Sequence, residues 1–508
     1  MGRLPIRSAW LLVVATSLCP VAAAPAQRTF IYTNDNATPN TVSAFSVSTS
    51  GALSPLAGSP FQTNGNSLGG GLPAADHIVT VGDRLYVTNT ASRTIGAFAI
   101  DPSTGALSPI GSPFVMNAGN VDGDISLAAT PDGRFLLAGS EGSMNLSVFA
   151  IGSDGSLTTI GNSPFPAGGT PGGMTVSPDG RFLAVALPDP NTLRGTIAMF
   201  AIADDGLLTP VPGSPFPNGG LGGNPGGVDI DCAGTRLFVG EASSSGTVVD
   251  VFTIASNGTL TPVPGSPFIE EAGVQSNFVL LDPDDGRLFV SNETNDSVTV
   301  FDVQSNGSLM PMPGSPFPVG SAGSGANGMA MTVAGPFLYV ADFHEHQVNQ
   351  VAVLRAAGTN DPLTQVPGSP FRTQQPGDLL SLVAFPAATC QLATIAARID
   401  VKPGKPKNRI DLATQKRVHV AILTTAALDA SAVDPQTVRF GPGAAPPTRR
   451  PGPHLEDVND DGEPDLVLRF QTGATGIRCG DTSVALTGTT FRGDTIEGSN
   501  SIRTVGCP

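Results

Sequence analysis

The tripeptide Ser-Pro-Phe occurs seven times in this chain of 508 residues, and its spacing constrains the fold more than any other feature of the sequence. The copies begin at Ser59, Ser112, Ser163, Ser214, Ser266, Ser315 and Ser369. Successive copies lie 53, 51, 51, 52, 49 and 54 residues apart. A period of about 50 residues is typical of the blades of a β-propeller. The spacing therefore predicts seven copies of one structural unit.

One repeat illustrates the secondary structure that we expect in all seven. Residues 174–176 form a short apolar strand, and an Asp-Gly pair in the following turn suits a tight hairpin. Residues 181–186, 196–202 and 207–216 are the expected second, third and fourth strands. Proline in the fourth strand suits an outer edge, where a missing N–H group costs least. Four antiparallel strands in each repeat make one propeller blade.

The first repeat lacks an innermost strand, because its second strand, at residues 30–33, comes close to the expected start of the mature chain. Residues 379–385 form an apolar segment after the last repeat and have no blade of their own. We predict that this segment is the inner strand of the first blade. Such closure leaves no open gap in the ring, whereas an open solenoid would expose its ends and require capping units.

The predicted fold class is therefore all-β, with a seven-bladed β-propeller followed by a small β-sandwich-like domain. We place the propeller at residues 27–390, a linker at 391–397 and the C-terminal domain at 398–508.

Residues 1–26 have the order of a signal peptide. Arg3 and Arg7 precede an apolar region formed by residues 10–15 and Leu18, and Ala-Pro-Ala at 24–26 fits a small-x-small cleavage site before Gln27. No other apolar run is long enough to span a bilayer. We therefore predict a secreted or periplasmic protein that begins at Gln27.

Removal of the signal peptide also removes Cys19 and leaves four cysteines, Cys232, Cys390, Cys479 and Cys507. An even number of cysteines in an exported chain permits disulfide bonds. Three pairings are possible. We favour Cys479–Cys507, because both residues lie in the small C-terminal domain.

The chain is acidic, with 26 Lys and Arg against 42 Asp and Glu and a net charge of −16. All the lysines lie after Cys390, at Lys402, Lys405, Lys407 and Lys416. An acidic body without a basic stripe argues against nucleic acids and anionic membranes as partners. We expect a protein or carbohydrate ligand whose identity the composition leaves open.

Two kinds of motif resemble those of known propellers. Tyr86-Val87-Thr88-Asn89 and the Pro-Asp-Gly-Arg-Phe turns at 131–135 and 178–182 resemble the YVTN and lactonase-type seven-bladed propellers, over about residues 28–390. Members of this superfamily include 6-phosphogluconolactonases and muconate-lactonizing enzymes, but also many secreted repeat proteins with no known chemistry. The resemblance implies a fold and leaves the activity open.

Loops on one face of the predicted disc carry the candidate functional residues, because binding residues usually lie on loops held by a rigid scaffold. This face gathers Asp76, His77, Asp122, Asp124, Glu141, Glu241, Glu293, Asp342, His344 and His346. His77 resembles the histidine before the inner strand in lactonase-type blades, and Glu293 resembles the acid of their Asn-Glu step; these two are the candidate catalytic residues. His344 and His346 are either an exposed loop pair or, pointing to the same side of an extended segment, two metal ligands.

The positions of the basic side chains distinguish two candidate functions. A lactonase requires a base or a positioned water, and cations to hold an anionic substrate. The propeller arginines mostly fall in hairpin turns on the opposite face, at Arg84, Arg134, Arg181, Arg236 and Arg287. We therefore favour a secreted binding or scaffold protein that offers its loop-lined face to a partner or glycan. A lactonase-type hydrolase that opens a sugar or carboxylic lactone is the alternative.

The C-terminal region is predicted to be a small β sandwich with strands near residues 418–423, 438–440, 466–470, 483–486 and 502–505. Its distinctive feature is Asp-x-Asn-x-Asp-Gly-x-x-Asp at residues 457–465, which resembles the short calcium loops of dockerin-like, thrombospondin-like and integrin-type repeats. The resemblance implies a structural calcium ion, with side chains of Asp457, Asn459, Asp461 and Asp465 and the carbonyl of Glu463 as ligands. Leu468 stands where an EF-hand has Glu, so this is not a full EF-hand. A solvated acidic turn is the other interpretation.

Overall fold

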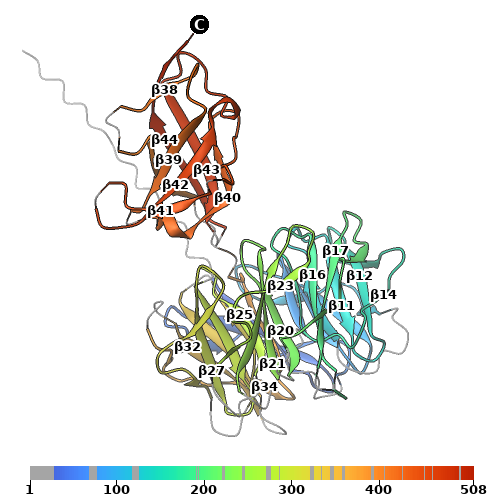
Figure 1. Cartoon of the computed structure of the whole chain (residues 1–508). Coiled ribbons are helices and arrows are strands. Elements are labelled where there is room, and N and C mark those ends of the chain that lie inside the picture. Colours follow the sequence, from blue (N-terminus) through green and yellow to red (C-terminus); the bar gives the residue numbers. More distant parts are fainter. Residues whose placement is uncertain are drawn as a thin grey trace, which may run out of the picture.

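A computed structural model of the chain shows a ring of β-sheets joined to a separate β sandwich (Figure 1). The structure describes residues 28–67, 77–116, 125–189, 191–192, 194–219, 223–242, 246–270, 276–284, 286–320, 325–332, 335–343, 348–356, 361–388, 390, 394–404, 407–425, 427–450, 452–459, 461–490 and 493–507. The predicted signal peptide, residues 1–26, lies outside this part of the chain.

Seven five-stranded antiparallel sheets form the ring, one for each repeat. Blade 1 contains β35 (Leu382–Phe385), β1 (Phe30–Asn34), β2 (Thr41–Val47), β3 (Leu53–Pro55) and β4 (Phe61–Gln62). Blade 2 contains β5 (Ile78–Val81), β6 (Arg84–Asn89), β7 (Thr94–Ile100), β8 (Leu107–Pro109) and β9 (Phe114–Val115). Blade 3 contains β10 (Ile125–Ala129), β11 (Phe135–Ser140), β12 (Asn145–Ile151), β13 (Leu157–Thr159) and β14 (Phe165–Pro166).

The remaining four blades repeat this order from the inner to the outer edge. Blade 4 contains β15 (Met174–Val176), β16 (Phe182–Leu187), β17 (Thr196–Ile202), β18 (Leu208–Pro210) and β19 (Phe216–Pro217). Blade 5 contains β20 (Asn224–Ile230), β21 (Arg236–Ala242), β22 (Val248–Ile254), β23 (Leu260–Pro262) and β24 (Phe268–Ile269). Blade 6 contains β25 (Ser276–Leu281), β26 (Arg287–Asn292), β27 (Ser297–Val303), β28 (Leu309–Pro311) and β29 (Phe317–Pro318). Blade 7 contains β30 (Gly325–Met331), β31 (Phe337–Phe343), β32 (Val348–Arg355), β33 (Thr364–Gln365) and β34 (Phe371–Pro376).

The predicted closure of the ring is confirmed. β35 pairs antiparallel with β1, with Thr33 opposite Leu382 and Phe30 opposite Phe385. The two ends of the propeller sequence therefore share blade 1, and every inner strand has a neighbour along its sheet.

The outer strand of each blade differs from the expected single strand, because it is divided into two short pieces that both pair with the third strand. The Ser-Pro-Phe serine lies at the break. In blades 1 and 3 to 7 its hydroxyl accepts a hydrogen bond from a backbone N–H of the third strand, as between Ser214 and Met199 at 2.9 Å and between Ser315 and Val300 at 2.8 Å. The serine thus satisfies a donor that the interrupted strand leaves without a carbonyl.

The hydrophobic core consists of seven layers, one between each pair of neighbouring blades. Alternate residues of one strand contribute to different layers. Phe30 and Tyr32 of β1 pack against blade 2, whereas Ile31 packs against blade 7. A buried second strand therefore reads as a continuous apolar run.

The turn between the third and fourth strands packs on the neighbouring blade at the junctions where the structure describes its glycine. The glycine of the turn between the third and fourth strands has positive φ and lies against the start of the second strand of the preceding blade, as with Gly105 (φ +74°) on Phe30 and Gly51 (φ +84°) on Phe337. Tyr32 donates its hydroxyl hydrogen to Gly105 O at 2.7 Å, and Tyr339 does the same to Gly51 O at 3.4 Å. These contacts join blade 1 to both of its neighbours.

The C-terminal region forms the predicted sandwich, from two four-stranded sheets and one small two-stranded sheet. The first sheet has the order β36 (Thr394–Ala396), β44 (Thr495–Ser501), β43 (Ser483–Thr490) and β40 (Val433–Phe440). The second has the order β37 (Arg398–Val401), β39 (Arg417–Leu423), β42 (Asp465–Gln471) and β41 (His454–Glu456), while β38 (Arg409–Asp411) pairs with β45 (Arg503–Val505). Short 3-10 helices, η1 (Ala430–Ala432) and η2 (Thr472–Ala474), complete the described elements.

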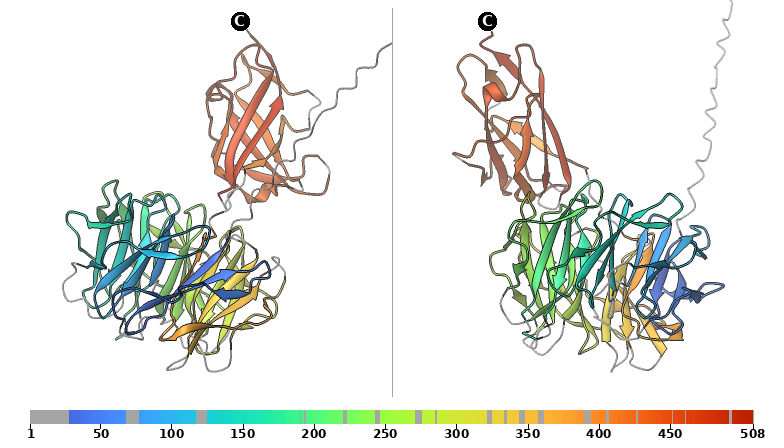
Figure 2. Two further views of the ribbon diagram at one scale, coloured as in Figure 1. Left: turned by 180° about the vertical axis from the view of Figure 1, so that it is seen from behind. Right: turned by 90° about the vertical axis from the view of Figure 1, so that its right-hand side faces the viewer.

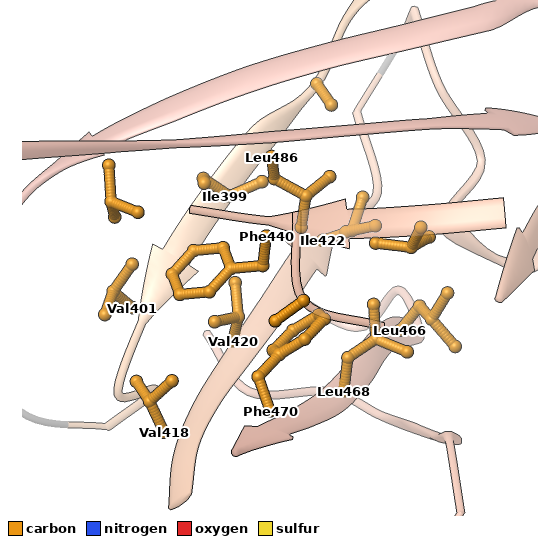
Figure 3. Close-up of a cluster of buried hydrophobic side chains, with 14 of the residues drawn as sticks. Ile399, Val401, Val418, Val420, Ile422, Phe440, Leu466, Leu468, Phe470 and Leu486 are labelled. Atoms are coloured by element: carbon orange, nitrogen blue, oxygen red, sulfur yellow. The ribbon is translucent and has the colours of Figure 1, made fainter. Parts of the chain in front are cut away.

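The two sheets of the sandwich enclose one apolar core (Figure 3). Phe440 from the first sheet stacks on Phe470 from the second, with ring centroids 4.9 Å apart. β36 occupies residues that we expected to be linker, because its pairing with β44 extends the first sheet. We did not predict β44 from the sequence, because it shows no apolar alternation and Ile496 is its only buried residue.

The structure contains two disulfide bonds, and one of them is the predicted pair in the sandwich. Cys479–Cys507 lies within the C-terminal domain, and Cys232–Cys390 connects the turn between β20 and β21 to the segment that leaves the propeller. Two disulfides indicate an extracytoplasmic protein.

The ring has two distinct faces. The turn face carries the hairpins between strands one and two and between strands three and four, and the loop face carries the other connections. The sandwich lies over the turn face in all views (Figures 1 and 2). A cavity of about 870 Å³ between them is lined by Cys232, Arg236 and Asn306 of the propeller and by Gln436 and Thr490 of the sandwich.

Replacement of Gly105 by Ala tests the packing between blades. A Cβ at Gly105 would overlap Phe30 Cδ1, whereas a Cβ at Gly111 (φ +64°) would meet nothing within 4 Å. Both changes introduce left-handed strain of about 1–2 kcal/mol. We expect Gly105→Ala to lower the free energy of unfolding by at least about 2 kcal/mol more than Gly111→Ala, as measured by urea denaturation. Equal losses in the two variants would show that the contact with Phe30 contributes nothing.

Candidate functional site

The loop face is the candidate functional site, and the structure describes part of its predicted residue set. His77, Glu141, Glu241, Glu293 and Asp342 lie at this face, at the ends of strands or in the connections between them. Asp76, Asp122, Asp124, His344 and His346 lie outside the described residues.

His77 is packed at the junction of blades 1 and 2. Its backbone N–H donates to Ser381 Oγ at 3.1 Å, and its carbonyl accepts from Thr88 N at 3.0 Å. The ring Nδ1 lies 3.4 Å from Thr88 Oγ1, and the residue is 1% exposed. The imidazole therefore lies inside the protein rather than on the surface of the loop face.

Glu293 follows β26 in blade 6 and is partly exposed. Blades 7 and 1 separate it from His77 in blade 2. Each belongs to its own blade junction.

The asparagine of the Tyr-Val-Thr-Asn motif connects two blades. Asn89 Oδ1 accepts hydrogen bonds from Thr63 Oγ1 at 2.6 Å and Asn40 Nδ2 at 3.0 Å, both in blade 1. Its Nδ2 donates to Thr94 Oγ1 of its own blade at 3.1 Å. An amide suits this position because it accepts and donates at once.

Blades 5, 6 and 7 carry Glu241, Asn292 and Asp342 at the position that Asn89 occupies in blade 2. All three are fully buried. In blade 5, Asp250 on β22 is also fully buried and lies beside Glu241. Sequence analysis missed Asp250, because one acidic residue in the middle of an apolar strand carries no motif.

The propeller arginines predicted for the opposite face are found there, and each has a structural partner. In these contacts, the arginine at the start of the second strand of one blade donates a hydrogen bond to the next blade. The acceptor is a backbone carbonyl in the turn between strands three and four of that blade. Examples are Arg134 to Asp204 O at 2.8 Å, Arg181 to Ser256 O at 3.0 Å and Arg287 to Ala356 O at 3.2 Å. These guanidinium groups join blades on the turn face.

Two further arginines, Arg93 and Arg194, lie in connections between second and third strands and therefore belong to the loop face. Sequence analysis did not include them among the candidate residues, although their place between two predicted strands was readable. They supply positive charge to a face whose other predicted groups are mainly acidic.

The centre of the ring contains an apolar cavity of about 270 Å³. Ile78, Met174, Phe278 and Leu382 are among its lining side chains. Asp229 also lines it, but both carboxylate oxygens accept backbone hydrogen bonds, from Ile230 N and Leu281 N at 2.9 Å. The described part of this channel thus resembles a packed core more than a catalytic pocket.

The acidic loop of the sandwich folds around its own side chains. Asp457 Oδ2 accepts from Gly462 N at 2.9 Å, and Asp461 Oδ1 accepts from Glu463 N at 3.0 Å. Asp465 is fully buried and accepts from Thr424 N at 2.8 Å and from Val458 N at 3.1 Å. In the described part of the chain, which excludes Asp460, no three His, Cys, Asp or Glu residues form a metal-binding group.

Residues 76–219 match the family described as lactonase, 7-bladed β-propeller, a segment shorter than a third of the chain. No curated protein matches the chain significantly. Similar solved structures include candidate 6-phosphogluconolactonases from Bacteroides fragilis (18% identity, 71% of this chain and 98% of that chain, TM-score 0.54) and Bacteroides uniformis (17%, 71% and 100%, 0.55). A protein from Lactobacillus plantarum is similar as well (15% identity, 70% and 99%, TM-score 0.50).

These comparisons show that the ring has the fold of a seven-bladed β-propeller and that residues 76–219 resemble the lactonase type. At such identities the structural likeness establishes the fold alone. Among the described residues, no helix is long and apolar enough to cross a membrane.

Asp35 at the loop face makes the stability of blade 1 depend on pH. The carboxyl accepts hydrogen bonds from Thr33, Thr41 and Ser43, yet burial raises its pKa to about 6. A folded pKa above the unfolded value means that the folded state keeps the proton longer, so the free energy of unfolding falls as pH rises from 4 to 6.

Between pH 4 and pH 7 we expect the free energy of unfolding of the wild type to fall by about 3 kcal/mol more than that of Asp35→Asn. Urea unfolding at both pH values measures the difference. The exposed Asp154→Asn variant serves as the control and should lose as much as wild type. A loss in Asp35→Asn equal to that of wild type would exclude Asp35 as the source.

Proposed function

We propose that this protein is an exported binding or scaffold protein that holds a protein or carbohydrate partner on the loop face of its propeller. The proposal rests on a structural difference between the turn face and the loop face of the propeller. The turn face holds the interblade arginines, the Cys232–Cys390 disulfide and the adjoining sandwich. The loop face carries the long connections and is turned away from the sandwich (Figure 2).

The charge of the loop face favours a neutral or basic partner. Its described residues include Glu141 and Glu293 together with Arg93 and Arg194, and the propeller as a whole is acidic. An anionic sugar would meet repulsion from the acidic propeller as a whole. Hydroxyl-rich glycans and basic peptide segments suit the face better than phosphorylated or carboxylate sugars do.

A lactonase-type hydrolase is the second candidate, and the family match at residues 76–219 favours it. The buried ring of His77 and its separation from Glu293 by two blades argue against a shared catalytic centre. A base must reach its proton within hydrogen-bond distance, directly or through one water. The described geometry therefore supports the binding function better.

A direct assay separates the two functions. We expect the mature protein to leave the hydrolysis of 6-phosphogluconolactone and glucono-δ-lactone at the spontaneous rate, as measured by proton release. Catalysis that falls at least tenfold in His77→Ala or Glu293→Gln would overturn the binding proposal in favour of the enzyme.

The same protein should bind members of an array of neutral oligosaccharides and basic peptides. Thr192→Arg and Thr294→Arg place bulk and positive charge on the loop face and should abolish that binding. The matched turn-face variants Ser50→Arg and Ser153→Arg should retain it. Binding that survives the loop-face changes but is lost with the turn-face changes would assign the partner to the other face.

A second proposal concerns the sandwich: the loop at residues 457–465 binds a structural calcium ion. The oxygen donors of Asp457, Asn459 and Asp461 are of the hard type that calcium prefers, and Gly462 (φ +90°) permits the sharp bend. Residues 457–465 include five acidic side chains, which repel one another unless a cation is present. Asp465, held by two backbone N–H groups, would anchor the end of the loop.

Calcium should therefore stabilise the sandwich in the whole chain. Ligand linkage raises the free energy of unfolding by about 2.7 kcal/mol at a hundredfold excess over Kd, and extracellular modules often bind calcium at about 10⁻⁴–10⁻³ M. Calorimetry in millimolar calcium and in chelator should show a rise in the transition temperature of the sandwich. Asp457→Ala with Asp461→Ala should remove that rise, and a shift that survives the double change would contradict the assignment.

A further inference from the structure

Two buried carboxyl groups face each other in blade 5. Glu241 ends the buried part of β21, and Asp250 lies on the neighbouring strand β22. Neither oxygen of the Glu241 carboxyl forms a hydrogen bond of good geometry with the described residues. The side chains of Asp250 and Asn218 are the polar groups that approach it. Asp250 accepts from Gly219 N at 2.7 Å and from Ser266 Oγ at 3.2 Å.

Blade 6 shows what the repeat normally places at these two positions. Val239 pairs with Asp250 in blade 5 as Val290 pairs with Thr299 in blade 6, so Asp250 and Thr299 are equivalent. Asn292 is equivalent to Glu241, and its Nδ2 donates to Thr299 Oγ1 at 2.8 Å. A complementary amide–hydroxyl pair in blade 6 is thus replaced in blade 5 by two groups that, when ionised, only accept hydrogen bonds.

The pair has no compensating positive charge in the described part of the protein. No Arg, Lys or His forms an ion pair with Glu241 or Asp250 there. Buried charges in proteins are paired or coordinate metals, because their desolvation is otherwise too costly. Burial, and then the Asp250 carboxyl, raise the pKa of Glu241 well above its usual value. A proton or a cation must therefore lie between the two groups.

We propose that Glu241 and Asp250 bind a divalent cation of the calcium type at the junction of blades 4 and 5. Up to four carboxylate oxygens are available, and the amide of Asn218 adds a neutral polar group at the edge of the site. Hard oxygen donors of this kind suit calcium. Asn218 and Gly219 are at least partly exposed, so the buried pair lies directly beneath the loop face.

The cation would have a structural consequence for the proposed binding face. Asn218 and Gly219 belong to the connection from blade 4 to blade 5, and Gly219 N already donates to Asp250. A metal held by Glu241 and Asp250 therefore fixes a loop-face connection to the rigid second and third strands of blade 5. The proposal does not depend on the identity of the partner or on the calcium loop of the sandwich.

Equilibrium dialysis with radioactive calcium tests the site in the whole mature chain. The background variant Asp457→Ala with Asp461→Ala removes the loop of the sandwich from the measurement. We expect this background to bind one calcium per chain, and the further change Glu241→Gln to weaken binding at least tenfold. Chelator should lower the transition temperature of the propeller in the background variant and leave it unchanged once Glu241→Gln is added.

Two further variants keep the result interpretable. Asp342→Asn changes the equivalent position of blade 7, where Ala352 stands in place of a second carboxyl, and should leave calcium binding unchanged. Glu241→Asn with Asp250→Thr recreates the pair of blade 6 and should fold and bind no calcium, even if Glu241→Gln fails to fold. A background variant that binds no calcium, or a Glu241→Asn/Asp250→Thr variant that still binds one, would overturn the proposal.

Discussion

Packing between neighbouring blades is the constraint on which the rest of this structure depends. Each blade is a small sheet that is apolar on both faces, so it is stable only between two others. The turn glycines lie directly on side chains of the preceding blade, as Gly105 lies on Phe30 and Gly258 on Phe182. The arginines and tyrosines of the second strands donate across the same junctions. Closure of blade 1 through β35 extends this arrangement around the whole ring.

The different roles of the turn face and the loop face follow from this packing between blades. Turns on one face are short and are held by interblade hydrogen bonds, so the residues there have little freedom to vary. The disulfide from Cys232 to Cys390 attaches the departing chain to this same face and brings the sandwich beside it. Variation is left to the loop face, where the ends of the second strands carry Asn89, Glu241 or Asp342 in different blades.

This variation also limits what a family resemblance conveys. The asparagine of the Tyr-Val-Thr-Asn motif is occupied in joining blades 1 and 2, so the motif reports a junction rather than a reaction. Chemistry specific to this chain is expected where a blade departs from the repeat. Glu241 and Asp250 are such a departure, since blade 6 has an amide and a hydroxyl at the same two places.

The sequence by itself determined the number of blades, the order of their strands, the closing strand and the Cys479–Cys507 pair, because period, alternation and turn chemistry are local signals. It also located the acidic loop of the sandwich. Only the tertiary structure decided that His77 is buried and separated from Glu293, that the turn-face arginines bind carbonyls of the next blade, and that Asp250 lies beside Glu241. These relations join residues whose positions depend on how one blade is set against another, and no local pattern records that geometry.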